Sequence, residues 1–439
     1  MRKLFVHSFG CRASQADGAA IESAMSSRGW ESSGAANDAE LVVLNTCTVT
    51  HSADQDLRHT VNRIHRENPE ARIVVTGCYA QRAPEEISKL PGVAMVVGNS
   101  HKISIPDLVD VPGDLPYHGQ VHVGDIFAQQ EFLSAPVEDA LGDRTRPNLK
   151  VQDGCNNRCS FCIIPFVRGR SRSAPADQVI EQVRVLALKY REVVLSGVNL
   201  GRWGREYGFS EEPVRLVNLI RRLLDETDVE RLRLSSVEPM DFSDELLELM
   251  AGSPRIAKHV HAPLQSGSDT VLRRMHRKYR PRHYEQRIQT ARSMMPDCAV
   301  GADVMVGFPG ESEAEFEQSR EFIDSLPFTY LHVFTYSARP GTPAAEQSEQ
   351  VPFPVRKKRN SILRELAARK NEAFRRSMIG RMLSAVTLDD GPLALTDNYL
   401  KVELAAPRMP NRLVDLRIGG LGEGTLREFN AFRVLAEPN

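Results

Sequence analysis

The sequence predicts an α/β protein in three parts: a parallel α/β sheet, a partial (β/α)6 barrel and a small antiparallel β-barrel. Short apolar runs alternate with stretches of helical periodicity through most of the 439 residues, and such βαβ patterns form parallel sheets. The tail instead holds short strands without helical periodicity, which is typical of a small barrel. We place the three parts at residues 1–134, 145–376 and 377–439.

The composition is that of an ordinary globular protein, with 41% apolar residues, 26% charged residues and a net charge of −1. This balance argues against a chain that coats nucleic acid by bulk attraction. The first residues do not have the pattern of a signal peptide, and no apolar run approaches membrane-spanning length. We therefore expect a cytoplasmic protein without membrane contact, in which cysteines are available as metal thiolates.

Four apolar runs in the first part are typical of strands, and helical stretches separate them. The strands are expected at 4–7, 41–45, 73–76 and 94–97, and the helices at 18–28, 52–68 and 84–90. Cys11, Cys47 and Cys78 each follow the end of one of these strands. Because ligands bind beyond the carboxyl ends of parallel strands, we expect the three thiols to converge on one ligand site. The alternative is three separate buried structural cysteines.

Residues 109–147 have the composition of a linker with one hairpin, and a second run of βα units follows. Strands are expected at 149–152, 192–195, 231–235, 259–262, 299–306 and 330–335, and helices at 175–190, 213–226, 244–251, 282–295 and 313–326. This gives about six units, fewer than a full eight-unit barrel. Polar and Gly-rich segments follow the strands, where barrels build their catalytic face.

A long basic helix is expected at 355–376, followed by the tail. The tail strands are expected at 383–387, 393–396, 400–404, 413–418 and 425–434. Basic residues crowd this helix and the stretch 273–282. Such patches favour contact with an anionic partner, and a solvated helix face is the alternative.

A second group of three cysteines lies within eight residues: Cys155, Cys159 and Cys162. Three thiolates from one tight loop suit one face of a four-iron cluster and leave one iron free for another ligand. Gly154 and the Asn156-Asn157 pair permit the necessary turns. A zinc site would require a fourth Cys or His nearby, and remains the alternative. We expect two [4Fe–4S] clusters, one for each trio, and interpret Cys298 as a small buried apolar residue.

The C-x-x-x-C-x-x-C spacing, with Phe161 before the last cysteine, resembles the radical S-adenosylmethionine superfamily. The resemblance implies that the free iron binds S-adenosylmethionine and that an electron from the cluster splits it into methionine and a 5′-deoxyadenosyl radical. Phe161 resembles the family aromatic near the adenine, and the segment from Gly197 to Asn199 resembles the region that receives the methionine moiety. Further cofactor contacts are expected at neighbouring strand ends, at Glu238, Gln265 and Ser266, with loop capping as the alternative.

Together with the first three cysteines, the resemblance narrows to the methylthiotransferases and covers essentially the whole chain. It rests on the segments 9–11, 45–50, 76–81, 155–169 and 263–268, while the tail around 396–402 is similar to the RNA-binding barrel called TRAM. The residues after Cys47 and Cys78 most resemble the branch that acts on N6-threonylcarbamoyladenosine. The chain departs from that branch at Arg12-Ala13-Ser14, where Lys-Val-Asn is usual. The departure concerns the surroundings of the first cluster and not Cys11.

This resemblance implies conversion of N6-threonylcarbamoyladenosine, next to the anticodon of tRNA, into its 2-methylthio derivative. One S-adenosylmethionine would donate a methyl group to sulfur held at the first cluster, and another would supply the radical. No catalytic residue beyond the cluster ligands is expected, because an unactivated aromatic C–H lies outside the reach of acid–base catalysis. The implied partners are tRNA, an electron donor and a sulfur source, and we expect a monomer. The basic helix and Arg168, Arg170 and Arg172 are expected to contact tRNA phosphates.

Several other functions are considered. A methylthiotransferase of isopentenyladenosine tRNA or of an aspartate in ribosomal protein S12 is disfavoured by the residues after Cys47 and Cys78. A radical enzyme of tetrapyrrole synthesis would leave the first three cysteines unexplained. A non-catalytic RNA-binding or zinc protein would contain zinc without sulfide. His261, at a strand end, is interpreted as structural.

Overall fold

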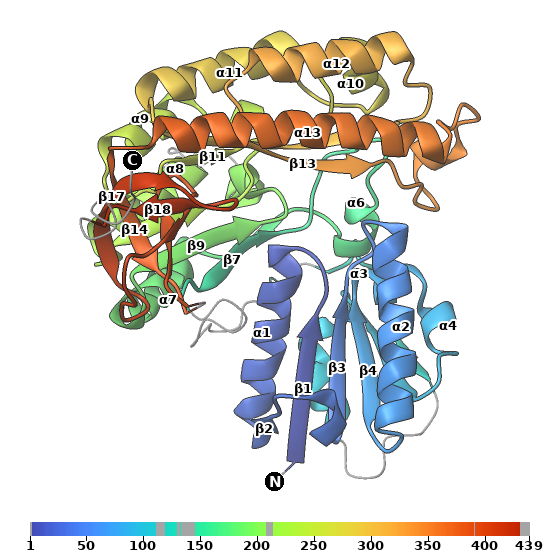
Figure 1. The fold of residues 1–439 in the computed structure, drawn as a ribbon. Helices are drawn as coiled ribbons and strands as arrows, with labels where there is room; N and C mark the ends of the chain where they lie inside the picture. The colour runs from blue at the N-terminus through green and yellow to red at the C-terminus, as the bar shows by residue number, and fades with distance from the viewer. Residues whose placement is uncertain are drawn as a thin grey trace, which may run out of the picture.

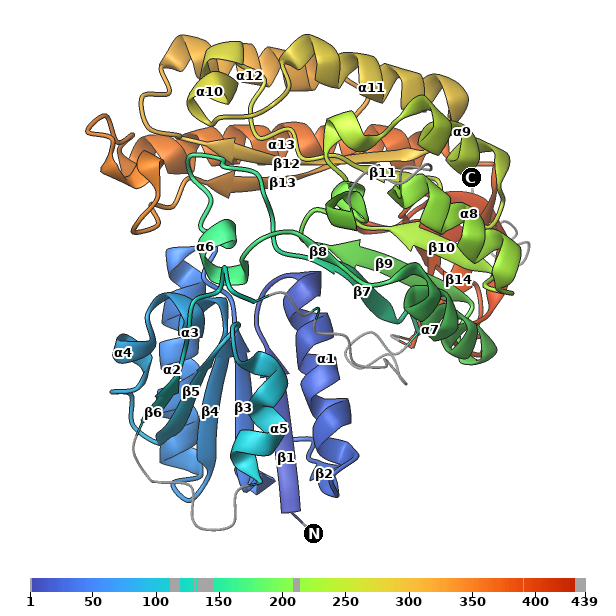
Figure 2. The same cartoon turned by 180° about the vertical axis from the view of Figure 1, so that it is seen from behind.

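The computed structural model describes residues 2–110, 119–129, 132, 145–207, 214–389 and 391–430. Figure 1 shows the N-terminal α/β part on one side of a larger barrel, with the small C-terminal barrel at one end of the latter. Figure 2 shows the same arrangement from behind. In the described part of the chain, no helix is both long and apolar enough to cross a bilayer.

The N-terminal sheet is parallel throughout its described strands, in the order β2-β1-β3-β4-β5-β6. Its strands are β1 (Arg2–Ser8), β2 (Trp30–Ser32), β3 (Leu41–Thr46), β4 (Arg72–Gly77), β5 (Val93–Gly98) and β6 (Gln120–His122). The four expected strands are confirmed, and β2 and β6 are additional. The prediction of a linker with one hairpin is wrong for β6, because this strand pairs parallel to β5 as part of the sheet. The remaining expected linker residues at 111–118, 130, 131 and 133–144 lie outside the described residues.

Helices cover both faces of this sheet: α1 (Arg12–Ser26), α2 (His51–Glu67), α3 (Cys78–Arg82), α4 (Pro84–Ile87) and α5 (Ile105–Val109). Alternate strand residues pack on opposite sides because the side chains of a strand point to its two faces in turn. Val42 packs with Leu57 of α2, whereas Val43 packs with Ile21 of α1. Helix α1 begins six residues earlier than expected, with the extended residue Cys11 at its N-cap.

The central part is a partial barrel made of two sheets, β10-β9-β7-β8 and β11-β12-β13. Its strands are β7 (Asn148–Asp153), β8 (Arg172–Ser173), β9 (Glu192–Gly197), β10 (Arg231–Leu234), β11 (His259–His261), β12 (Ala299–Val306) and β13 (Tyr330–Thr335). A bridge between Leu232 and Ile256 joins the two sheets. Apart from the short antiparallel β8, the described strands run parallel. The expected six βα units are confirmed.

The outer layer of the barrel consists of helices that cover one continuous apolar core. They are α7 (Ala176–Lys189), α8 (Leu216–Glu226), α9 (Asp244–Gly252), α10 (Asp269–Arg274), α11 (Pro281–Met294) and α12 (Glu313–Ser325). The short helix α6 (Ile164–Arg168) instead lies at the junction with the N-terminal part. Helix α6 packs beside α3 of the N-terminal part, as both figures indicate. Residue 213, the expected start of α8, lies outside the described residues.

The basic helix α13 (Phe353–Ser377) runs along the outside of the barrel and leads into the tail. There β14 (Met382–Thr387), β15 (Leu393–Thr396), β16 (Lys401–Glu403), β17 (Leu413–Leu421) and β18 (Leu426–Glu428) close into a barrel in the order β14-β15-β16-β18-β17. The expected five-stranded tail barrel is confirmed, although its last strand ends at Glu428; residues 431–434 lie outside the described residues. Arg233 of β10 donates to the carbonyl of Thr396 at 2.9 Å and fastens the tail to the central barrel.

Candidate metal centre

The first cysteine trio lies at the carboxyl ends of three adjacent strands. Strands β1, β3 and β4 are neighbours in register, with Ser8 opposite Asn45 and Asn45 opposite Thr76. A Cβ atom added to Gly10 would lie 2.9 Å from Cys47 Sγ, so the loop carrying Cys11 passes directly over Cys47. Gly10 has φ +90°, a backbone region that favours glycine. The expected convergence of Cys11, Cys47 and Cys78 at one edge of the sheet is therefore present.

Two of these three thiols are buried. Cys47 is 6% exposed and Cys78 2% exposed, whereas Cys11 is exposed. Burial, together with the neighbouring Cys78 and Cys11, raises the pKa of Cys47 to about 12. Because metal binding requires thiolates and releases their protons, this trio is suited to gaining its negative charge together with a cation.

Hydrogen-bond donors surround the first trio. The backbone N–H of Val49 donates to Cys47 Sγ at 3.5 Å, and Asn99 Nδ2 donates to Cys78 Sγ at 3.7 Å. Ser14 Oγ lies 3.7 Å from Cys11 Sγ, so the residue that departs from the expected pattern contacts the trio. Such donors stabilise the negative charge on cluster sulfur atoms.

The second trio lies in the loop that follows β7. Gly154 has φ +69°, and an added Cβ would lie 2.0 Å from the carbonyl oxygen of Arg170, so glycine is needed at this turn. The N–H of Cys155 donates to Gly169 O at 3.1 Å and closes the loop. Burial raises the pKa of Cys155, and raises that of Cys162 to about 12 with a further contribution from Cys159.

Side chains from other strand ends donate to the second trio. Asn199 Nδ2 lies 3.6 Å from Cys155 Sγ, and its backbone N–H donates to Gln152 Oε1 at 2.6 Å. Arg277 donates to Cys159 Sγ at 3.3 Å and to Glu238 at 2.5 Å. Arg277 belongs to the basic stretch 273–282, for which an anionic partner or a solvated helix face was expected, but it is buried beside the trio. No spacing rule links it to cysteines more than 100 residues away.

The other predicted cofactor contacts lie in different surroundings. Glu238 and Cys159 line one pocket together with Arg277, while Gly197 packs against Gln152 at the end of β9. Phe161 is partly buried against the barrel core. Gln265 has φ +65° and is bound through its backbone to Asp303 and Met305. Ser266 is buried, with its hydroxyl 2.9 Å from that of Ser319. Their contact with a cofactor stays a prediction.

The two trios meet at the junction of the N-terminal part and the barrel. Cys78 packs against Ile163 and Val167, which directly follow the second cysteine loop. Asn99, which donates to Cys78, also donates to Val167 O at 2.7 Å. Two sites that are far apart in the sequence therefore share one wall.

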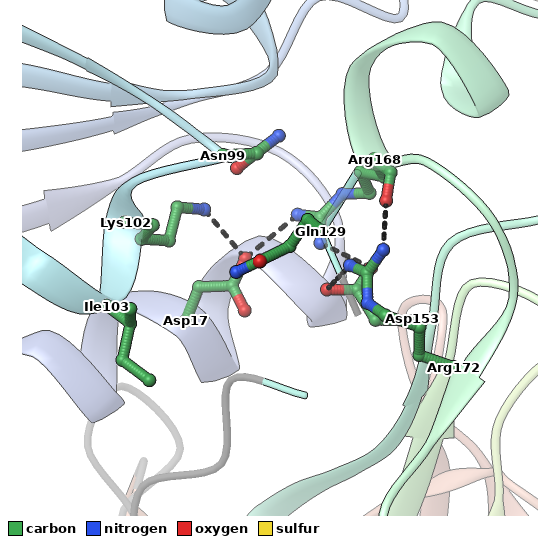
Figure 3. Close-up of a pocket in the computed structure, with 8 residues that line it drawn as sticks. All are labelled: Asp17, Asn99, Lys102, Ile103, Gln129, Asp153, Arg168 and Arg172. Atoms are coloured by element: carbon green, nitrogen blue, oxygen red, sulfur yellow. Dashed lines mark hydrogen bonds and ion pairs between the residues drawn. The ribbon is translucent and has the colours of Figure 1, made fainter. Parts of the chain in front are cut away.

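A buried network of charges holds this junction together, and Figure 3 shows most of it. Asp17 of α1 accepts from Lys102 at 2.9 Å and from Arg168 at 3.0 Å, and it also pairs with Lys150 of β7. Arg168 also forms an ion pair with Asp153 at 2.9 Å. Burial raises the pKa of Asp17, but the surrounding cations outweigh burial and hold the pKa well below its usual range.

The N-terminal part is also fastened to both open edges of the partial barrel. Beside β7, Asn148 donates to Arg12 O at 2.7 Å. After β13, Ser337 accepts from the N–H of His51 at 3.2 Å, and Arg339 pairs with Asp54 at 2.7 Å. The loops carrying Cys11 and Cys47 consequently face the open side of the barrel.

Arg168 corrects one expectation. It is 1% exposed and held by two carboxylates, so it is not available to a tRNA phosphate. The basic helix has both buried and exposed basic residues. Arg359 is buried against Glu311, whereas Lys357 and Lys358 are exposed. Cys298 is fully buried in the barrel core, as expected.

Comparison with known proteins identifies the family. Residues 3–98 match the model of the Uncharacterized protein family UPF0004, and residues 149–323 match the Radical SAM superfamily. The threonylcarbamoyladenosine tRNA methylthiotransferase MtaB of Aquifex aeolicus is 36% identical over 95% of this chain and 100% of its own. The chain belongs to the radical S-adenosylmethionine methylthiotransferases.

Two further relatives are more distant. The tRNA-2-methylthio-N(6)-dimethylallyladenosine synthase of Syntrophotalea carbinolica is 33% identical over 81% of each chain. Among solved structures, the radical S-adenosylmethionine methyltransferase TsrM of Kitasatospora setae superposes with a TM-score of 0.57 at 16% identity, covering 79% of this chain and 77% of its own. That likeness concerns the fold.

Membership of the radical S-adenosylmethionine superfamily implies S-adenosylmethionine and a [4Fe–4S] cluster as cofactors. The donor set of the second trio fits such a cluster: Cys155 and Cys159 accept hydrogen bonds, and soft thiolates suit iron and sulfide. The polar pocket beside Cys159, which Glu238 and Arg277 also line, adjoins this trio.

Proposed function

We propose that this chain methylthiolates N6-threonylcarbamoyladenosine in tRNA. The observation that carries the proposal is the convergence of two cysteine trios on one junction, where Cys78 packs against the segment after Cys162. The likeness to threonylcarbamoyladenosine tRNA methylthiotransferases spans nearly all of this chain and supports this substrate. The dimethylallyladenosine enzyme is similar over a smaller share of the chain.

Each trio would hold its own [4Fe–4S] cluster. Cys155, Cys159 and Cys162 would bind the cluster that works with S-adenosylmethionine, and Cys11, Cys47 and Cys78 would bind a second, sulfur-carrying cluster. Three thiolates leave one iron of each cluster open to a ligand that is not protein. When bound, these groups supply a radical able to remove hydrogen from an unactivated carbon, together with the sulfur that replaces it.

The residues of the chain position these groups and exclude water. Arg277 holds Glu238 and Cys159 at one wall of the pocket, and Asn199 is fixed by Gln152 beside Cys155. Phe161, Gly197, Gln265 and Ser266 are our further candidates for cofactor contact. An apolar wall of Ile163 and Val167 separates Cys78 from the second loop, which restricts solvent between the two trios.

We assign the three parts of the chain, at residues 1–134, 145–376 and 377–439, to the second cluster, the radical chemistry and RNA binding. The tail barrel docks on the central barrel, with Asn398 donating to Asp297 O at 3.0 Å. The exposed basic residues of α13, among them Lys357 and Lys358, would meet tRNA phosphates. An electron donor and a sulfur source complete the set of partners, and we propose a monomer.

Nucleoside analysis of tRNA from cells with and without the gene tests this proposal. The 2-methylthio derivative of threonylcarbamoyladenosine should disappear from the deletion strain and return with the wild-type gene but not with Cys47→Ala. If the deletion strain instead lacks the 2-methylthio derivative of dimethylallyladenosine, the chain belongs to the branch that acts on that nucleoside. If tRNA is unchanged and ribosomal protein S12 loses its methylthio group, the substrate is that protein and not tRNA.

A further inference from the structure

Three neighbouring strands of the central barrel bring two imidazoles and a carboxylate together. His261 ends β11, Asp303 lies in β12 and His332 lies in β13. In register, His261 is opposite Gly301 and Asp303 is opposite His332. One ligand atom from each of the three side chains lies within 4.8 Å of the other two.

Both imidazoles face the same carboxylate oxygen. Nε2 of His261 lies 3.5 Å from Asp303 Oδ1, and Nδ1 of His332 lies 3.2 Å from it. A carboxylate oxygen and two imidazole nitrogens are donor types that divalent transition metals accept in proteins.

His261 has the hydrogen bond that commonly orients a metal ligand. Its Nδ1 lies 2.6 Å from Ser236 Oγ, and its side chain is 7% exposed. Among the described residues, its buried Nε2 has no hydrogen-bond partner. In the tautomer whose Nδ1 donates to Ser236, Nε2 carries a lone pair that faces the Asp303 carboxylate, and a cation between these two atoms would be attracted to both.

Two neighbouring basic side chains are engaged with other partners. His259 is stacked on Tyr399 with a ring separation of 4.4 Å, and its Nε2 lies 2.7 Å from the hydroxyl of Tyr330. The Arg233 guanidinium is engaged with Glu192 and with the tail barrel.

We propose that His261, Asp303 and His332 bind a divalent transition-metal ion inside the barrel. Two imidazoles and one carboxylate form a harder donor set than the thiolate trios and suit Zn²⁺ or Mn²⁺ in preference to an iron–sulfur cluster. Three protein ligands leave coordination positions open. The His332 side chain is 53% exposed, so water or oxygen donors can reach these positions.

Metal retention by the cluster-loaded enzyme tests this site. The protein is equilibrated anaerobically with Mn²⁺ and, separately, with Zn²⁺, passed through a desalting column and analysed for manganese, zinc, iron and sulfide. The wild type should retain about one added ion per chain. His332→Phe and Asp303→Asn, which keep the shape of each side chain, should retain less than about a tenth of that amount.

His59→Phe is the matched control, because His59 is exposed on α2 far from the three strands in sequence. It should retain the ion as the wild type does. Iron and sulfide should be equal in all four proteins, which separates this site from the cluster trios and from misfolding. Retention of neither ion by the wild type would overturn the proposal, as would equal retention by the His332 and Asp303 variants. A failure of the proposed tRNA function would leave these results unaffected.

Discussion

The two cysteine trios have similar surroundings but are assembled by different means. Cys155, Cys159 and Cys162 come from a single loop closed by Gly154, whereas Cys11, Cys47 and Cys78 come from the ends of three strands. Burial raises the pKa of Cys162 and of Cys47 to about 12, and N–H donors surround both trios. One trio is therefore set by local chain geometry and the other by the register of a sheet.

Because of this difference, the geometry of each trio depends on different parts of the protein. The loop trio depends on turns within its own segment and on Arg277, whose charge lies beside Cys159. The strand-end trio depends on the N-terminal sheet remaining docked on the barrel, since Asn99 connects Cys78 to Val167. Separate mutations should consequently disable one trio and spare the other.

Removing one cysteine from each trio gives the largest expected effect. Cys47→Ala and Cys159→Ala should each abolish methylthiolated tRNA, because each would remove one of the three proposed ligands of a cluster. Formation of 5′-deoxyadenosine from S-adenosylmethionine should persist in Cys47→Ala and be lost in Cys159→Ala. Chromatography of both products measures this. Cys298 is a buried cysteine outside the trios, so the control variant Cys298→Ala should retain both activities. Full methylthiolation by Cys47→Ala would contradict a role for the strand-end trio in the reaction.

Breaking the buried network at the junction should have the next largest effect. Asp17→Asn leaves Lys102, Lys150 and Arg168 short of a counter-charge, which should cost about 3–5 kcal/mol. Urea unfolding can be followed through Trp30 in the N-terminal part and Trp203 in the barrel. The matched control Asp177→Asn removes an exposed carboxylate paired with Arg222 and should change little.

The same network predicts a pH dependence. Because the pKa of Asp17 and that of Asp153 are held low in the folded protein, their contribution is present above about pH 4 and is lost as the pH falls further. The unfolding free energy of the wild type should fall more steeply with acidification than that of Asp17→Asn. Parallel curves for the two proteins would contradict the assigned role of Asp17.

Smaller effects should distinguish the donors of the two trios. Arg277→Gln removes a positive charge beside Cys159 and should make the reduction potential of the loop cluster more negative. Asn99→Ala removes a neutral hydrogen-bond donor to Cys78. It should lower the reduction potential of the cluster at the strand-end trio, by less than Arg277→Gln lowers that of the loop cluster. Redox titration followed by EPR measures both shifts. Arg273→Gln, whose exposed guanidinium pairs with Asp269, is the control and should leave both potentials unchanged.

The smallest effect is expected on the outer helix. Replacing the exposed Lys357 and Lys358 by Gln should weaken tRNA binding and reduce the slope of log affinity against log salt by about 2. Filter binding over a range of salt concentrations measures the slope. Lys370→Gln is the comparison variant, because Lys370 is bound to the carbonyl oxygens of Asp324 and Leu326. An unchanged slope in the double variant would exclude this face from tRNA contact.

Much of the fold follows from local pattern. The apolar runs of β3 and β4 and the six βα units were predictable because buried parallel strands are continuously apolar. Strand β2 was not, since its three residues contain one apolar side chain, Trp30. The start of α1 was missed because Cys11 provides an N-cap without a side-chain hydrogen bond.

The site was predictable where the chemistry belongs to a motif. Cysteine spacing and strand ends indicated both trios, but Asp17 and Lys150 meet across 133 positions, which no spacing rule detects. Arg168 was assigned to phosphate contact because it lies among other basic residues, yet two distant carboxylates bury it. Contacts between the parts of the chain therefore required the three-dimensional structure.

Anaerobic iron and acid-labile sulfide analysis of the wild type and of both cysteine variants tests the central claim most directly. Two clusters predict about eight irons per wild-type chain and about four in Cys47→Ala and in Cys159→Ala. A wild type with about four irons, or a Cys47→Ala protein that retains about eight, would contradict the assignment of one cluster to each trio.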